Sequence, residues 1–169
     1  MSSQARPAAL LAWIAFGAAR AALGILWLHE GWFKYRAHFG RADILLVVDG
    51  AKANSRVPDY FTALSESVLR DNAGLFGVMI PLLETTLGIA LIVGVLSLPA
   101  AMGSILTLLS YWSSDQLIAQ YPIMAALSVI VIAWPAQSTR LSATSLVVRT
   151  LHRRQRGQRL IEGPLRRWL

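Results

Sequence analysis

The apolar stretch from Ala8 to Lys34 constrains the fold most. Its length is close to what a helix needs to cross the roughly 30 Å hydrocarbon core of a bilayer. Arg20 lies at its middle, where a charge costs at least about 2.5 kcal/mol on insertion scales and therefore faces protein or water. A stripe at helical spacings of three and four follows one face: Arg20, Gly24, Trp27, Gly31 and Lys34. We expect this face to receive other helices.

Composition also indicates a membrane protein. The 169 residues are 55% hydrophobic and 15% charged, whereas soluble globular proteins carry about 25% charged residues. The chain has no cysteine, which excludes disulfides, iron–sulfur clusters, c-type haem attachment and thiol chemistry within it. The three histidines, His29, His38 and His152, lack the spacing of metal ligands, so we expect no metal site.

The excess positive charge lies in the last part of the chain. From Gln137 onward, eight arginines face one acidic residue, Glu162, which accounts for the whole net charge of +7. By the positive-inside rule this tail is cytoplasmic, and with four spans the N-terminus is too. The basic amphipathic stretch Leu146–Leu160 is expected to bind anionic lipid headgroups. No aromatic-rich surface accompanies the charge, so we do not expect nucleic acid as a partner.

Four apolar segments predict an all-α, integral membrane four-helix bundle in residues 1–137, followed by a basic cytoplasmic tail in residues 138–169. The predicted spans are 8–34, 73–96, 100–114 and 122–134, with 141–148 as a candidate extension of the last. A short turn at Ser97–Pro99 makes the second and third spans antiparallel neighbours. A cleaved signal peptide ending near Ala21 is the alternative for the first span, but the apolar run resumes directly after Arg20.

The long polar connection, residues 35–72, is expected at the outer face of the membrane. Within it, Asp43–Val48 is too short to span and predicts a buried or interfacial segment, ended by a turn at Asp49-Gly50. The stretch Pro58–Asp71 predicts an amphipathic helix that lies on the membrane or covers the helix ends. The connection between the third and fourth spans, 115–121, is expected on the same side.

Arg20 and Glu84 lie near the middle of the first and second predicted spans. Neighbouring antiparallel helices bring such positions to one depth, where an ion pair removes two costly buried charges. We therefore predict a structural ion pair between Arg20 and Glu84 that fixes the helix register. The alternatives are that the pair borders a quinone or proton path, or that the two side chains do not meet.

Polar and aromatic side chains of the first and third predicted helices, Tyr111 among them, gather near the outer interface. Glu30, His29 and Lys34 are the catalytic candidates, because Glu30 or His29 is suited to proton exchange and Lys34 to polarising a quinone carbonyl. Four further residues are candidates for binding the quinone: Trp27, Trp32, Trp112 and Asp115. A simpler interpretation of the Trp and Tyr residues is that they anchor the helices at the interface.

Two patterns carry a family resemblance. Residues 20–34 contain R-x-x-L-G followed by L-x-x-G-x-x-K, and residues 81–94 contain P-L-L-E-T-T-L-G followed by Leu91 and Gly94. These patterns, the long outer loop and Trp112 late in the third helix resemble the DoxX-like membrane proteins, in particular the DoxD type. The resemblance covers about residues 18–135 and leaves out the basic tail.

The resemblance implies a multi-pass subunit of the cytoplasmic membrane. The DoxD type is the large membrane subunit of thiosulfate:quinone oxidoreductase, which passes electrons from thiosulfate to membrane quinone with a second subunit. It implies quinone as cofactor and other membrane or redox-enzyme subunits as partners. We expect the quinone to enter between the first two spans near the outer leaflet. The rival hypothesis is a non-catalytic accessory or anchoring subunit of a larger respiratory or redox complex. A small transporter fits less well, because no paired broken-helix repeat is present.

Overall fold

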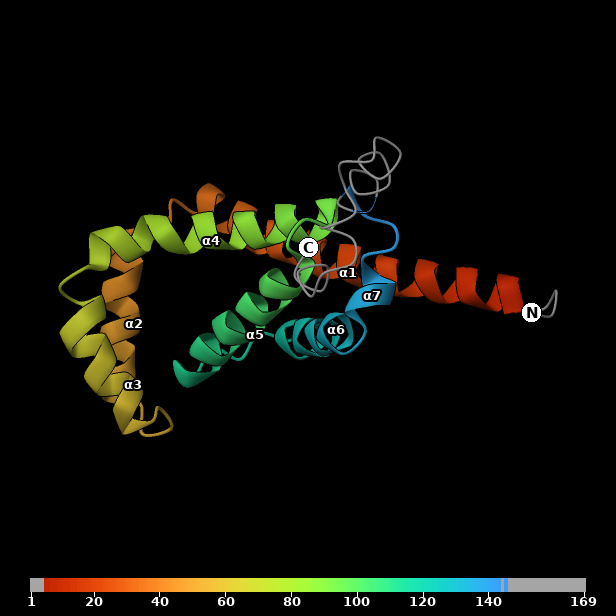
Figure 1. Cartoon of the computed structure of the whole chain (residues 1–169). Coiled ribbons are helices and arrows are strands. Elements are labelled where there is room, and N and C mark those ends of the chain that lie inside the picture. The colour runs from red at the N-terminus through yellow and green to blue at the C-terminus, as the bar shows by residue number, and fades with distance from the viewer. Residues whose placement is uncertain (1–4, 144, 146–169) are drawn as a thin grey trace, which may run out of the picture.

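The structure, a computed structural model, describes residues 5–143 and 145, whose regular secondary structure is entirely helical (Figure 1). The described part contains seven α-helices and one π-helical turn: α1 (Ala5–Arg36), α2 (Arg41–Ala53), α3 (Asp59–Leu64), η1 (Ser65–Leu69), α4 (Ala73–Val93), α5 (Ser97–Ser113), α6 (Tyr121–Ala133) and α7 (Pro135–Ser138). The predicted all-α class is confirmed. The stretch Leu146–Leu160, predicted to bind lipid headgroups, lies outside the described residues.

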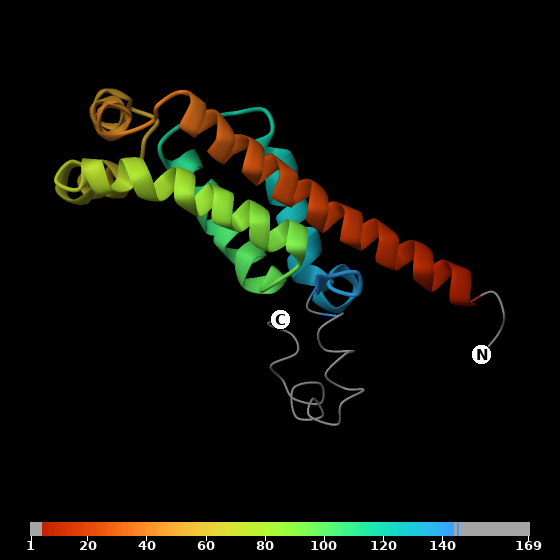
Figure 2. The same cartoon turned by 90° about the horizontal axis from the view of Figure 1, so that it is seen from above.

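Four of these helices pack in a ring. α1 lies against α4 and α6, and α5 lies against the same two helices from the other side. α1 and α4 run side by side over most of the length of α4 (Figures 1 and 2). Small residues permit this approach: a Cβ on Gly24 would lie 2.8 Å from the Gly88 carbonyl oxygen, and a Cβ on Gly31 would lie 2.5 Å from Thr85 Oγ1. The glycine stripe therefore meets another helix, as predicted.

The ring encloses an apolar core. Its most buried side chains come from all four helices: Leu23, Trp27, Leu87, Leu91, Ala101, Leu108, Met124 and Val131. The outer faces are apolar too, with more than half of the side chain exposed at Leu75, Val78, Leu106 and Val129. Two helices are long and apolar enough to span a bilayer, α1 from Leu10 onward and α4. These features support membrane association.

The short helices α2 and α3, with η1, form a unit at one end of α1 and α4, which they cross (Figures 1 and 2). We call it the α2–α3 end. Ile44 and Val48 are buried, as the predicted buried segment requires, but the predicted turn at Asp49-Gly50 is wrong. α2 continues to Ala53 because Ala51 packs against Val57 and Phe61 in a second small core.

Three hydrogen bonds join this unit to the end of α5 and to the connection that follows it. Tyr60 Oη lies 2.6 Å from Ser113 Oγ, and Asp115 accepts hydrogen bonds from Asn54 Nδ2 at 2.6 Å and Arg56 at 2.5 Å. The prediction that residues 35–72 and 115–121 lie at the same end of the molecule is confirmed.

The turn between α4 and α5 lies earlier than predicted. It occupies residues 94–96, and Ser97 already begins α5. Gly94 ends α4 with a φ of +76°, a left-handed conformation that favours glycine. Pro99 fits inside the first turn of α5, where its missing N–H would have no helical partner anyway.

Candidate functional site

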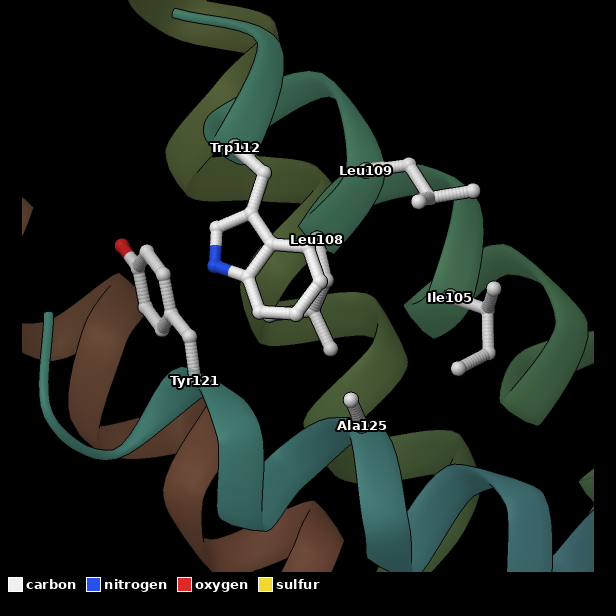
Figure 3. A pocket seen from close by; sticks show the side chains of 6 residues that line it. All are labelled: Ile105, Leu108, Leu109, Trp112, Tyr121 and Ala125. Carbon is white, nitrogen blue, oxygen red and sulfur yellow. The ribbon is translucent and has the colours of Figure 1, made fainter. Parts of the chain in front are cut away.

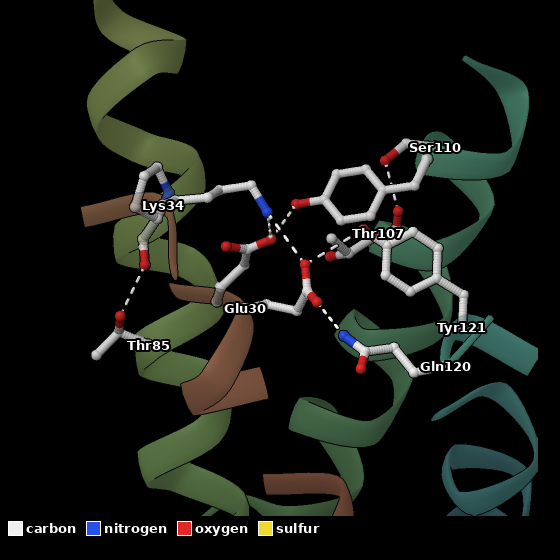
Figure 4. Close-up of polar contacts among 10 residues, drawn as sticks. Glu30, Lys34, Thr85, Thr107, Ser110, Gln120 and Tyr121 are labelled. Carbon is white, nitrogen blue, oxygen red and sulfur yellow. Dashed lines mark hydrogen bonds and ion pairs between the residues drawn. The ribbon is translucent and has the colours of Figure 1, made fainter. Parts of the chain in front are cut away.

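A buried ion pair links α1 to α4 in the half of the ring nearer the α2–α3 end (Figure 4). Lys34 Nζ lies 2.6 Å from Glu84 Oε1 and 3.4 Å from Glu30 Oε2. Glu84 is fully buried and Glu30 nearly so. Glu30 and Lys34 are four residues apart and so share one face of α1, and Gly31 between them lets α4 bring Glu84 close.

Three further side chains complete what we call the polar cluster: Tyr111, Gln120 and Tyr121. Tyr111 Oη donates to Glu84 Oε1 at 2.5 Å, and Tyr121 Oη donates to Glu30 Oε2 at 3.3 Å. Gln120 Nε2 donates to Glu30 Oε1. Lys34 Nζ also lies 5.3 Å from the centroid of the Tyr111 ring, within cation–π distance.

One oxygen of the polar cluster has no partner. Glu84 Oε2 is buried and accepts no hydrogen bond within the part of the chain that the structure describes. Buried polar atoms are nearly always hydrogen-bonded, so this one marks a place where a proton or a ligand group can be accommodated. Chemically, the cluster offers two carboxyl groups, one ammonium and two phenols, a set suited to holding and moving protons.

A small apolar pocket opens on the surface between α5 and α6 (Figure 3). It is lined by Ile105, Leu108, Leu109, Trp112, Tyr121 and Ala125. Tyr121 belongs to both sites, because its ring lines the pocket while its hydroxyl donates to Glu30. Trp112, a predicted binding residue, lies at this pocket and is half exposed.

Trp27, another predicted binding residue, is a core residue. Its indole is fully buried, and Nε1 donates to Ser104 Oγ at 2.8 Å. Ser104 in turn lies 2.8 Å from Ser128 Oγ. This chain ties α1 to α5 and α6 one layer below the polar cluster, where Trp27 has no access to a ligand at the surface.

The predicted Arg20–Glu84 ion pair is wrong. Arg20 is buried, and within the described residues its guanidinium donates to backbone carbonyls near the end of α4, at the end of α7 and just beyond it, namely those of Leu91, Ile92, Ser138 and Leu141. Glu84 lies two helical turns away along α4 and pairs with Lys34. The prediction placed both residues near mid-helix at one depth, but α1 has 32 residues and α4 has 21, and the middle of α1 meets the C-terminal end of α4.

Three other predicted site residues lie outside the polar cluster. His29 and Trp32 are on the exposed face of α1, and Trp32 stacks with Arg36 at 5.7 Å. Asp115 binds Asn54 and Arg56 at the α2–α3 end. Of the three catalytic candidates, the structure therefore brings together Glu30 and Lys34 but not His29.

Gln120 and Tyr121 were not predicted. The signal in the sequence was a pair of polar side chains immediately before the apolar run that forms α6. Their position next to Glu30 depends on the packing of α6 against α1, which the sequence pattern does not reveal.

Comparison with family models, with curated proteins and with solved structures gave no match to this chain.

Proposed function

We propose that this chain is the membrane subunit of a quinone-linked redox system, in which α1, α4, α5 and α6 form an integral membrane four-helix bundle. Two helices of spanning length and the apolar outer faces of α4, α5 and α6 support a multi-pass arrangement. α5 and α6 have 17 and 13 residues, about 25 and 20 Å of helix, so the bilayer thins around them or their ends lie within it.

The observation that carries the quinone proposal is the position of Tyr121 between the apolar pocket and the polar cluster. Ligand sites typically combine an apolar wall with a few polar groups that fix orientation. A quinone needs the same combination, since it has an apolar ring and tail and two carbonyl oxygens that take up protons on reduction. In this proposal Leu108, Leu109 and Trp112 contact the quinone, and Tyr121 and Glu30 supply and return protons.

The proposal differs from the sequence-based hypothesis at two points. The quinone site lies between α5 and α6 rather than between the first two spans, because the pocket is there. Lys34 pairs with the carboxyl groups of Glu30 and Glu84 rather than polarising a quinone carbonyl, because both of them contact its ammonium group. Electrons come from a partner redox subunit, and thiosulfate is the donor that the DoxD resemblance suggests.

The first test is quinone binding by the purified chain. A short-chain quinone should raise its melting temperature, since a ligand that binds only the folded state stabilises it. Leu109→Trp fills the pocket and should abolish the shift. Leu106→Trp is the matched control on the same helix, because Leu106 is exposed and does not line the pocket. A shift that Leu109→Trp leaves unchanged contradicts the site, and no shift in the wild type contradicts the proposal.

The alternative is a non-catalytic accessory subunit of a larger respiratory or redox membrane complex. It is favoured by the number of contacts that the polar cluster makes between helices, because a Lys34–Glu84 cross-link also serves simply to hold α1 against α4. Purification from the native membrane in mild detergent separates the two. A large assembly that retains its activity when Leu109→Trp is present supports the accessory role.

A further inference from the structure

The polar cluster has unequal numbers of opposite charges. Two carboxyl groups, Glu30 and Glu84, share a single ammonium, Lys34, and both lie within 3.4 Å of the same nitrogen. Tyr111 and Tyr121 are hydrogen-bond donors to the carboxylates and therefore carry their protons. With both carboxyl groups ionised, the cluster has a net charge of −1. These are the titratable groups that α1, α4, α5 and α6 direct into it.

The surroundings of the polar cluster disfavour that net charge. An uncompensated charge in an apolar interior costs several kcal/mol, of order the cost of a single charge at mid-bilayer. Two carboxyl groups that share one site avoid this uncompensated charge when one of them binds a proton. The unpartnered Glu84 Oε2 is the second, independent sign, because a buried carboxylate oxygen without a donor is a natural position for a proton.

We propose that Glu30 and Glu84 form a site for one proton, which they share, and that this proton exchanges with water at the α2–α3 end only. Binding converts one carboxylate and a proton from water into a carboxylic acid and takes the charge of the polar cluster from −1 to zero. The inference stands without a quinone, although it gives the proposed function a proton reservoir beside Tyr121.

The position of the apolar core decides which end is open. On each of the four helices, a buried apolar side chain lies one helical turn farther from the α2–α3 end than the cluster residue. These side chains are Trp27 next to Glu30, Leu87 next to Glu84, Leu108 next to Tyr111 and Met124 next to Tyr121. On the other side, Lys34 and Glu30 keep 13% and 8% of their side chains exposed, and Gln120 is half-buried. Water therefore reaches the carboxyl groups from the α2–α3 end.

The proton is tested with dicyclohexylcarbodiimide, a membrane-permeant reagent that adds to protonated carboxyl groups in apolar surroundings. The full chain in lipid nanodiscs is treated at mildly alkaline pH, and mass spectrometry locates the adduct. We expect modification of Glu30 or Glu84 in the wild type. No adduct on either residue overturns the proposal.

Sharing is tested by removing one carboxyl group at a time. In Glu84→Gln one carboxyl group faces one ammonium, so the cluster is neutral without an added proton, and we expect the labelling of Glu30 to fall about tenfold or more. Glu30→Gln has the same effect on Glu84. Lys34→Met acts in the opposite direction and increases labelling. Glu66→Gln is the matched control, since Glu66 pairs with Lys52 at the exposed α2–η1 contact and should leave labelling unchanged. If the carboxyl group that is labelled in the wild type keeps its labelling when the other one is replaced by glutamine, the shared site is overturned.

A measurement on the wild type alone guards against variants that fail to fold. Infrared spectra of protein with carbon-13 glutamate should show the C=O stretch of a protonated carboxyl at neutral pH, and its absence overturns the proposal.

The side from which water reaches the carboxyl groups is tested with a water-soluble carbodiimide, which is added to one face of oriented vesicles. Modification from the α2–α3 face alone supports the proposal, and modification from the opposite face contradicts it. Quinone binding without an adduct would preserve the proposed function and refute only the proton site.

Discussion

Arg20 and Lys34 are both buried among helices, and the structure neutralises them in different ways. Lys34 has carboxylate partners, whereas the partners of Arg20 in the described part of the chain are backbone carbonyls. Carbonyls at a helix C-terminus carry partial negative charge, because they lack N–H partners from a following turn. The planar guanidinium, with five donors, can serve several such carbonyls at once. Arg20 thus joins the ends of α4 and α7 to the middle of α1.

Arg20→Met should destabilise the protein strongly. It removes the charged donor and leaves several buried carbonyls without a partner, and each such loss costs about 1–3 kcal/mol. We expect a large drop in melting temperature in detergent, and Arg20→Lys should recover little because an ammonium cannot match the fork of donors. Arg140→Met is the control, since Arg140 is exposed and its guanidinium lies over the face of the Trp13 ring. Equal effects of Arg20→Met and Arg140→Met would contradict the capping role.

At the scale of helices, the α1–α4 contact determines where every polar group meets its partner. The contact is close because glycines face backbone or side-chain atoms of the opposite helix at Gly24, Gly31 and Gly88. Without side chains at these positions, the two backbones come close enough for dispersion contacts, which drive the association of helices in lipid, the environment proposed for this chain. The register of this contact brings Lys34 to Glu84 and Arg20 to the end of α4.

Replacing glycine by alanine at two helical positions should therefore change the stability of the protein in opposite directions. Gly31→Ala places a Cβ 2.5 Å from Thr85 Oγ1 and should separate α1 from α4, with a lower melting temperature and weaker quinone binding. Gly50→Ala has nothing within 4 Å of its Cβ and lies inside α2. This substitution should raise the free energy of unfolding by about 0.5–1 kcal/mol, because it reduces the conformational entropy of the unfolded chain. A stabilising Gly31→Ala would show that the packing is looser than described.

At the scale of the molecule, the α2–α3 end differs chemically from the opposite end, where α7 lies and which we call the α7 end. The α2–α3 end carries the polar cluster and the contacts between residues 35–72 and 115–121, whereas α7 precedes the arginine-rich part of the sequence. If the chain crosses the membrane as proposed, the positive-inside rule places the α7 end in the cytoplasm. The proton site then faces the outer side.

Cysteine labelling tests this orientation directly, because the natural chain has no cysteine. Ser55→Cys and Leu117→Cys lie at the α2–α3 end, where both positions are exposed. They should react with an impermeant maleimide on intact cells. Ala136→Cys, on the exposed face of α7, should react only after permeabilisation. Labelling of Ala136→Cys on intact cells would reverse the orientation, and labelling of all three would argue against a spanning bundle.

The sequence alone determined the helical class, the two long apolar helices and the meeting of the two polar connections at one end. It also singled out Glu30, Lys34, Glu84 and Tyr111, because ionisable or hydroxyl side chains in apolar helices stand out from their neighbours. Such features are local, since they follow from composition and periodicity within one helix.

Tertiary structure alone decided which of those groups pair. The sequence places both Arg20 and Glu84 near mid-helix. Because the helices differ in length and meet at the glycine contacts, Arg20 donates to backbone carbonyls and Glu84 pairs with Lys34. The packing of α6 against α1 brought in Gln120 and Tyr121 and turned His29 outward to the surface. Register between helices depends on side-chain volume across the interface, a property of two helices together that periodicity within either one does not encode.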